Sequence, residues 1–265
     1  MKICMAGAKG RMGKRILELA AAAEDTEIGA AFDLPECAGE ELIAGAESGS
    51  PESVTLAPDA ATAIAQADVL IDFTVAGVCL DHVRAATEAG KPSVLGTTGL
   101  SDAQKADLAR LAENVPIVFA PNMSVGVNLL FKLTKEAASV LGLDYNVEIT
   151  EVHHNQKVDS PSGTAVHLAE LAAETLGLNY EENTVHGREG MVGKRPQRQI
   201  GMHALRGGDV AGDHTVAFIG QGERVELTHR AHNRDNFARG ALIAAKFATQ
   251  AAPGLYDMQD VLGLK

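Results

Sequence analysis

Residues 1–125 alternate between short apolar runs and alanine-rich segments, and this alternation is the strongest constraint on the fold. The apolar runs are rich in Val and Ile and predict buried strands: KICMAG, EIGAAFD, DVLIDFT, PSVLGTT and PIVFAPN. The segments between them have helical spacing: MGKRILELAAAAED, VAGVCLDHVRAATEAG and SDAQKADLARLAEN. Strands that alternate with helices predict a parallel sheet covered on both faces. Ser101 is a suitable helix N-cap, and Gly90 is suited to follow a helix end.

The pattern changes near Asn122. Residues 124–142 predict one long helix, and strand-like runs follow: YNVEITEVHH, RQIGMHALRGG, HTVAFIGQG and ERVELTHRAH. Their GG and GQG spacers predict hairpins in a mixed or antiparallel sheet. Residues 183–200 are polar, Gly-rich and basic, and predict a long loop. We therefore expect one domain over 1–124, a second over 125–235, and a C-terminal helix and tail over 236–265 that pack back on the first.

Composition limits the classes of partner and compartment. The formal net charge of -12 argues against nucleic acid and anionic membrane surfaces, which require clustered positive charge. The three cysteines, Cys4, Cys37 and Cys79, are widely spaced and predict reduced, mostly buried thiols with neither a disulfide framework nor a zinc pattern. The first residues lack a signal-peptide core, and no apolar run approaches the roughly 20 residues that span a bilayer. We expect a cytoplasmic protein.

The glycine-rich stretch AGAKGRMG joins the first predicted strand to the first predicted helix. Gly7, Gly10 and Gly13 would let backbone N–H groups approach a pyrophosphate at the helix N-terminus. Asp33 ends the second strand about 20 residues later, where an acidic residue binds the adenosine ribose. The stretch therefore predicts dinucleotide binding, although the middle glycine is shifted from the common fingerprint and a purely steric turn is the alternative.

Residues around Asp33 favour NADH over NADPH. Asp33 is followed by Leu34 and not by a cation, and its carboxylate would repel the extra phosphate of NADP. Lys9 and Arg11 either offset that repulsion or are simply solvated surface charges, so use of both coenzymes stays open. GTTG at 96–99 and APNMSVG at 120–126 follow two further strands, where they could lie against the cofactor or serve only as turns.

The stretch EVHHNQKVDSPSGTA, residues 151–165, carries the densest chemistry. Strand alternation points His153 and His154 to opposite faces unless the strand ends there, so only one is expected to transfer a proton. Lys157 could hold a carboxylate or donate a proton. Gly163 and Thr164 would begin the next helix with free N–H groups facing an anion, while Ser162 or Thr164 could merely cap it. The stretch predicts a site for a small carboxylate that needs a proton; zinc is less favoured because further ligands are not evident.

These stretches, above all EVHHNQKVDSPSGTA, resemble the dihydrodipicolinate reductase (4-hydroxy-tetrahydrodipicolinate reductase) family of the bacterial and plant lysine pathway. The resemblance runs from AGAKGRMG to RAHNRDNFARGAL, and Ser160 replaces a frequent alanine. It implies an α/β fold, with a Rossmann-like parallel-sheet domain for the dinucleotide, an α+β mixed-sheet domain for the substrate, and a homotetramer built through the mixed sheets. It also implies NAD(P)H-dependent reduction of a small dicarboxylate in lysine and diaminopimelate biosynthesis.

The resemblance assigns roles residue by residue. His153 matches the proton donor or acceptor and Lys157 the second proton donor. His154, Gly163 and Thr164 match the substrate-binding set, and Arg234 matches an arginine close to the histidine pair. No metal is implied. The positions that match cofactor contacts are Gly7, Ala8, Lys9, Gly10, Arg11, Met12, Asp33, Gly96, Thr97, Thr98, Ala120, Pro121, Asn122 and Met123. Leu34 replaces the family's NADP-binding arginine.

Two other functions are considered from the residues. An aspartate-semialdehyde or homoserine type of dehydrogenase is one; the former needs a cysteine nucleophile, and Cys79 falls in a predicted helix without a basic partner. A nonenzymatic nucleotide sensor is the other; it would keep the glycine turn without needing His153 or Lys157. Loss of turnover with retained NADH binding in a His153→Gln variant would separate an enzyme from a sensor.

Overall fold

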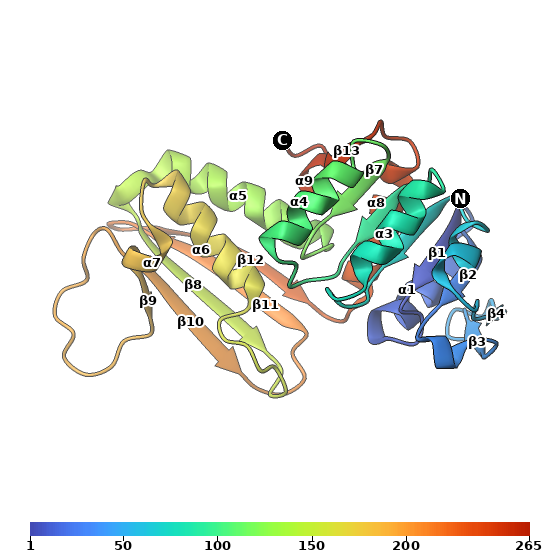
Figure 1. Ribbon diagram of the computed structural model, residues 1–265. Helices are drawn as coiled ribbons and strands as arrows, with labels where there is room; N and C mark the ends of the chain where they lie inside the picture. The colour runs from blue at the N-terminus through green and yellow to red at the C-terminus, as the bar shows by residue number, and fades with distance from the viewer. The chain divides into compact units, whose positions relative to one another are not determined.

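The computed structural model describes residues 1–265. The chain divides into two compact units, and Figure 1 shows their helices and strands. The first unit contains 1–125 and 234–265, and the second contains 126–233. The C-terminal helix α8 (Asp235–Ala248) thus belongs to the unit that begins the chain.

The first unit is built on a six-stranded sheet whose strands are all parallel. Its order is β13 (Gly254–Tyr256), β7 (Pro116–Phe119), β6 (Ser93–Leu95), β5 (Val69–Asp72), β1 (Lys2–Ala6) and β2 (Glu27–Phe32). The predicted parallel sheet is confirmed. Because every strand runs the same way, the carboxyl ends of all six meet at one edge.

Helices cover both faces of this sheet, as alternate residues of β1 make clear. Ile3 and Met5 join an apolar cluster with α1 (Arg11–Ala21) and α8, whereas Cys4 and Ala6 join a cluster on the other face with α2 (Ala60–Ile64) and α3 (Cys79–Glu88). A further cluster joins α3 to α4 (Asp102–Leu111). Burial on both faces explains why the strands are continuous apolar runs.

Two predicted helix ends are confirmed. The Ser101 hydroxyl accepts a hydrogen bond from the Gln104 N–H at 3.3 Å, and the Gln104 side chain accepts one from the Ser101 N–H at 2.9 Å. This capping box begins α4. Gly90 has φ of +66° just after the end of α3, in the left-handed region where glycine is favoured.

The second unit is built on a mixed five-stranded sheet. Its order is β12 (Arg224–Ala231), β11 (Gly212–Ile219), β8 (Asn146–His153), β10 (Ile200–Arg206) and β9 (Thr184–His186). The helices α5 (Val125–Leu141), α6 (Gly163–Thr175) and α7 (Tyr180–Asn183) lie on one side of it in Figure 1. Apolar residues of α5 and α6 form one core with Val147, Ile149, Val216 and Phe218 of the sheet.

One of the two predicted hairpins is wrong. The GQG spacer does join the antiparallel neighbours β11 and β12. The Gly207–Gly208 spacer, by contrast, separates β10 from β11, and β8 lies between those two strands, parallel to β10 and antiparallel to β11. Local turn chemistry does not decide which strand fills that place, because the choice depends on pairing distant in sequence.

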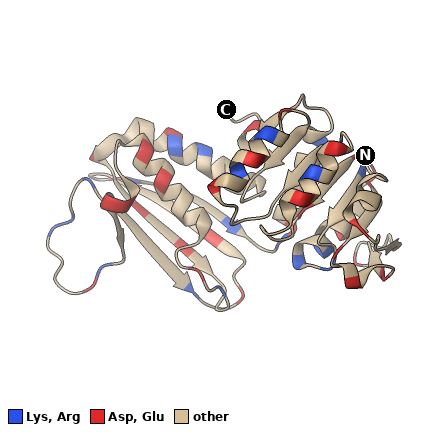
Figure 2. Cartoon of the chain, viewed as in Figure 1, with Lys and Arg blue, Asp and Glu red and all other residues tan.

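Several short elements differ from the prediction. Strand β9 occupies the first residues of the predicted loop 183–200, and the antiparallel pair β3 (Glu41–Ala44) and β4 (Glu52–Thr55) was not anticipated. Elements of three to five residues are too short to show a period. The rest of that loop carries basic residues, drawn blue in Figure 2: Arg188, Lys194, Arg195 and Arg198. The longest helix, α5, has 17 residues, and none combines the length and apolarity needed to span a bilayer.

Candidate active site

The glycine-rich turn between β1 and α1 has the geometry of an anion-binding turn. Gly7 has φ of +76°, its N–H donates to the Phe32 carbonyl at 3.1 Å, and its own carbonyl accepts from the Gly10 N–H at 3.0 Å. A Cβ on Gly13 would lie 2.1 Å from the Gly7 carbonyl oxygen, so only glycine allows α1 to start this close to the turn. Gly10 is the N-cap and offers no capping side chain, which leaves the first N–H groups of α1 available to a phosphate.

A cavity of about 580 Å³ adjoins this turn, which is a size suited to a small ligand or cofactor. Asp33 lines it, just beyond the end of β2, and its carboxylate accepts from the Lys9 N–H at 2.7 Å and the Leu34 N–H at 2.9 Å. Its walls are mainly apolar and include Phe32, Leu34, Pro35, Pro58, Phe73 and Val78. The turn, the acidic side chain and the apolar walls fit the phosphate, ribose and adenine of a dinucleotide.

The remaining cofactor-matched residues lie at the same edge of the sheet. Gly96, Thr97 and Thr98 follow β6, and the segment 120–123 follows β7. A Cβ on Gly96 would lie 2.2 Å from the ring of Phe73, so this glycine is required by close packing. Parallel strand direction therefore brings together every position that the sequence matched to the cofactor.

Sequence reasoning missed the polar cluster at the end of β5. Asp72 is fully buried, and its carboxylate accepts from the hydroxyls of Thr74 at 2.7 Å and Thr97 at 2.9 Å and contacts His82 Nδ1 at 2.7 Å. Thr74 and His82 line the cavity. The available signal was that IDFT ends a third parallel strand at the same sheet edge.

The cysteines do not provide a nucleophile. All three are buried and free of disulfides. Burial first, and the nearby Asp72 second, raise the pKa of the Cys79 thiol to about 11, so it is un-ionised near neutral pH. This argues against the aspartate-semialdehyde type of chemistry.

In the second unit, strand register builds a polar row across the helix-covered face of the sheet. His214 of β11 pairs with Glu151 of β8 on one side and with His229 of β12 on the other. Two residues earlier along β8, the equivalent row is apolar and contains Ile149 and Val216. The sheet thus changes from apolar core to ionisable cluster where β8 approaches its end.

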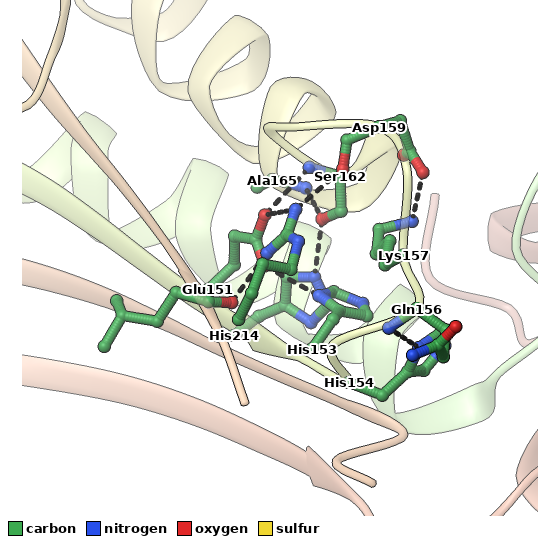
Figure 3. A network of polar contacts seen from close by, with 11 residues as sticks. Glu151, His153, His154, Gln156, Lys157, Asp159, Ser162, Ala165 and His214 are labelled. Carbon is green, nitrogen blue, oxygen red and sulfur yellow. Dashed lines mark hydrogen bonds and ion pairs between the residues drawn. The ribbon is translucent and has the colours of Figure 1, made fainter. Parts of the chain in front are cut away.

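Glu151 is the centre of this cluster. It has no exposed surface, and its carboxylate accepts four hydrogen bonds, drawn in part in Figure 3. Oε2 accepts from His153 Nδ1 at 2.6 Å and Arg206 Nη1 at 2.8 Å, and Oε1 accepts from Arg206 Nη2 at 2.9 Å and the Ser162 N–H at 3.0 Å. Burial alone would raise the pKa of Glu151, but the hydrogen bonds from Arg206, His153 and Ser162 outweigh it and lower the pKa.

His153 is the last residue of β8 and is 8% exposed. Burial lowers its pKa, and the hydrogen bond to Glu151 only partly offsets that effect. Since a carboxylate can only accept, Nδ1 carries the imidazole proton and Nε2 is left for other contacts. A Cβ on Gly212 would lie 3.0 Å from Nε2, so glycine at this place in β11 leaves room beside the ring.

His214 lies beside His153, with 5.2 Å between the ring centroids (Figure 3). Its Nε2 is 3.0 Å from the Ser162 hydroxyl, and its Nδ1 is buried without a partner. Burial first, and the neighbouring His153 second, lower the pKa of His214 to about 3. The ring is therefore neutral near pH 7.

The other predicted substrate residues lie in the loop after β8 and at the start of α6. Ser162 is the N-cap, and its hydroxyl accepts from the Ala165 N–H at 3.2 Å, so Gly163 and Thr164 do begin the helix. His154 lies just past the end of β8, and Lys157 follows in the same loop with its Nζ 2.8 Å from Asp159. Glu151, Arg206, Ser162 and His214 were missed as members of this cluster. The i, i+2 spacing of Glu151 and His153 in the strand was the one available signal.

Arg234 and the histidine pair belong to different units. Arg234 is exposed, occupies the N-cap position of α8, and belongs to the first unit. Its predicted closeness to the histidine pair stays a prediction.

Comparisons with known proteins agree over both units. The family model described as "Dihydrodipicolinate reductase, N-terminus" matches residues 1–123, and the model described as "Dihydrodipicolinate reductase, C-terminus" matches residues 126–262. A 4-hydroxy-tetrahydrodipicolinate reductase of Thiobacillus denitrificans is 50% identical over 268 residues, covering 100% of this chain and 99% of the relative. One of Syntrophotalea carbinolica is 48% identical, with 100% of both chains covered.

The chain is also similar in structure to a solved protein. Dihydrodipicolinate reductase from Paenisporosarcina sp. TG-14, solved with dipicolinate bound, aligns with a TM-score of 0.78 at 25% identity, and 98% of each chain is covered.

Because His214 is buried and neutral, we expect the folded chain to lose stability in acid. The His214 pKa of about 3 in the folded chain lies below the ordinary value of 6.5, so the stability it contributes is complete above pH 6.5 and is lost as the pH falls toward 3. The free energy of unfolding of a His214→Gln variant, whose amide can still reach Ser162, should fall less steeply with decreasing pH than that of the wild type. Below pH 6 the two slopes should differ by roughly 1 kcal/mol per pH unit. Urea unfolding of both proteins at pH 7, 6, 5 and 4 measures this. The same substitution at the exposed His232 is the control, and parallel pH dependences for wild type and His214→Gln would contradict the expectation.

Proposed function

The chain belongs to the dihydrodipicolinate reductase family, and from this premise we propose that it catalyses the NAD(P)H-dependent reduction of 4-hydroxy-tetrahydrodipicolinate to tetrahydrodipicolinate, a step of lysine and diaminopimelate biosynthesis. The observation that carries the proposal is the hydrogen-bonded pair of the Glu151 carboxylate and the His153 imidazole beside the N-terminus of α6. It supplies a proton-transferring group next to an anion-binding helix end.

The first unit is proposed to hold the coenzyme, and the second to hold the substrate. The N–H groups at the start of α1 would bind the pyrophosphate, Asp33 the adenosine ribose, and the residues after β6 and β7 the nicotinamide half. When bound, the coenzyme supplies hydride to C4 of the substrate ring. The chain itself supplies placement, charge and the proton.

The substrate is a small dicarboxylate, and the net charge of -12 makes local cations necessary. Lys157 and the N–H groups of Gly163 and Thr164 are proposed to hold its carboxylates, with His154 as a further contact. In the free protein Lys157 is paired with Asp159 at 2.8 Å. A substrate carboxylate would replace Asp159 as the partner of the Lys157 ammonium group. Lys157 would then be the second proton donor.

His153 is proposed to transfer the proton. Its Nδ1 is engaged by Glu151, so Nε2 is the nitrogen that faces the reaction. Burial favours the neutral ring in the free protein, and a doubly negative substrate beside it would favour the protonated ring. Binding of the substrate would thus prepare the group to donate.

Turnover is the direct test. Purified protein should oxidise NADH, NADPH or both when pyruvate and aspartate semialdehyde are freshly condensed in the assay, as followed at 340 nm. A His153→Gln variant should lose about 100-fold or more in kcat, since general acid catalysis commonly contributes that much, and it should still bind NADH. No oxidation of either coenzyme by the wild type would remove the proposed function; unchanged turnover in the variant would remove His153 from it.

NADH is the proposed preferred coenzyme. Asp33 and Asp59 line the cavity, which has no Lys or Arg in its wall, and Lys9 Nζ is paired with Glu40 at 2.7 Å. A 2′-phosphate there would meet carboxylates and no cation. We expect Leu34→Arg, at a position that is 60% exposed, to raise the NADPH-to-NADH ratio of kcat/KM about tenfold, equivalent to about 1.4 kcal/mol. Leu34→Gln is the neutral control, and an equal ratio in the wild type and both variants would contradict the assignment.

A homotetramer built through the mixed sheets is also proposed. The residues of β8 and β11 that alternate with the core face away from α6, and Thr150, Val152 and Thr215 among them are only partly exposed. Light scattering should give about four times the chain mass of 27.7 kDa. Thr215→Arg should lower that mass, whereas Ser139→Arg on the exposed side of α5 should not. A monomeric wild type would overturn the tetramer.

A further inference from the structure

The buried carboxylate of Glu151 transfers no proton and holds no part of the substrate, yet it joins three separate elements. It lies in β8, accepts both forked hydrogen bonds from Arg206 at the end of β10, and accepts the backbone N–H of Ser162 at the start of α6. It also accepts from Nδ1 of His153 at 2.6 Å. One carboxylate therefore fixes both the proton-transferring ring and the end of the helix that is to bind the anion.

The four donors around Glu151 determine its protonation state. Both oxygens face donors only, so the group must be a carboxylate that accepts everywhere. This fixes the proton of His153 on Nδ1 and turns Nε2 away from the cluster, on the side that Gly212 leaves open. A neutral amide in place of the carboxylate would present an NH₂ group to a donor, and the imidazole could meet it only by moving its proton to Nε2.

The charges that face the imidazole come from four places. Glu151 from β8 stabilises the protonated ring. Arg206 from β10 and Lys157 from the loop after β8 oppose protonation, and His214 from β11 is a neutral ring 5.2 Å away. Glu151 and Arg206 thus act on His153 in opposite directions while holding each other in place.

We propose that Glu151 is the positioning residue of the reaction: its carboxylate holds the His153 imidazole with Nε2 toward the substrate and stabilises the imidazolium, while Arg206 keeps that carboxylate in place. The proposal rests on the proposed function, because it assigns His153 the proton that completes the reduction. Neither Glu151 nor Arg206 is proposed to touch the substrate.

Opposite substitutions give opposite results. For a proton donor, kcat/KM falls as the pH rises through the pKa of His153. Glu151→Gln removes the stabilising charge and should move this fall to lower pH by about one unit or more, with kcat lowered at least tenfold. Arg206→Gln removes an opposing charge and should move the fall to higher pH. If the two substitutions only disturbed the fold, kcat/KM would be lower at every pH, and the pH at which it falls would be the same in both variants.

Two controls complete the kinetic test. Glu148 lies on the same strand and is likewise bound by arginines and a histidine, Arg188, Arg195 and His203, but on the face away from α6. Glu148→Gln should keep the wild-type pH profile. Glu151→Asp keeps the charge and should restore the profile toward that of the wild type, even where kcat stays reduced.

A spectroscopic arm does not depend on turnover. Nitrogen NMR of histidine-labelled protein, with the His153 signals identified from a His153→Gln sample, should show the Nδ1-protonated ring in the wild type and the Nε2-protonated ring in Glu151→Gln. If Glu151→Gln does not fold, Arg206→Gln and Glu151→Asp still test the proposal. The same profile and the same tautomer in all variants would overturn it. An inactive wild type that shows the expected tautomers would instead overturn the proposed function and leave the positioning intact.

Discussion

The buried carboxylate of Glu151 is the interaction on which the candidate active site depends. An ion taken out of water costs several kcal/mol unless partners replace its hydration, and Glu151 receives four hydrogen bonds, two of them from the guanidinium of Arg206. The cost is offset only when β8, β10 and the start of α6 are all in place. The same contacts that make the charge tolerable therefore define the geometry around His153, and a misplaced element would leave a buried charge unpaired.

Sheet architecture decides where chemistry is placed in each unit. In the first unit all strands run parallel, so turns from distant parts of the chain meet at one edge beside the cavity. In the second unit β8 pairs in parallel with β10 and antiparallel with β11. The register of the antiparallel pair places His214 opposite Glu151. The apolar core ends where this row begins, so one face of one sheet carries both the core of the second unit and the candidate site.

An acidic chain that must bind a dianion has to solve a local electrostatic problem. In the proposed function helix N-termini supply part of the answer without any net positive charge, because Gly10 and Ser162 stand at the N-terminal ends of α1 and α6. Lys157 adds a cation in the loop before α6, and Asp159 holds it there in the free protein. The excess of Asp and Glu elsewhere has little effect on either proposed anion site, because solvent and salt screen distant charges.

The sequence by itself determined the parallel sheet, the glycine turn, the Ser101 cap and the motif around His153, because each depends on residues close together in the chain. It also carried enough motif to identify the family. Tertiary structure alone decided that β8 separates β10 from β11, that Thr74 and His82 line the cavity beside the buried Asp72, and that Arg206 and His214 join Glu151. Those outcomes depend on which strand pairs with which and in what register, and pairing between residues more than 50 positions apart is set by burial of a whole sheet face and not by any local pattern.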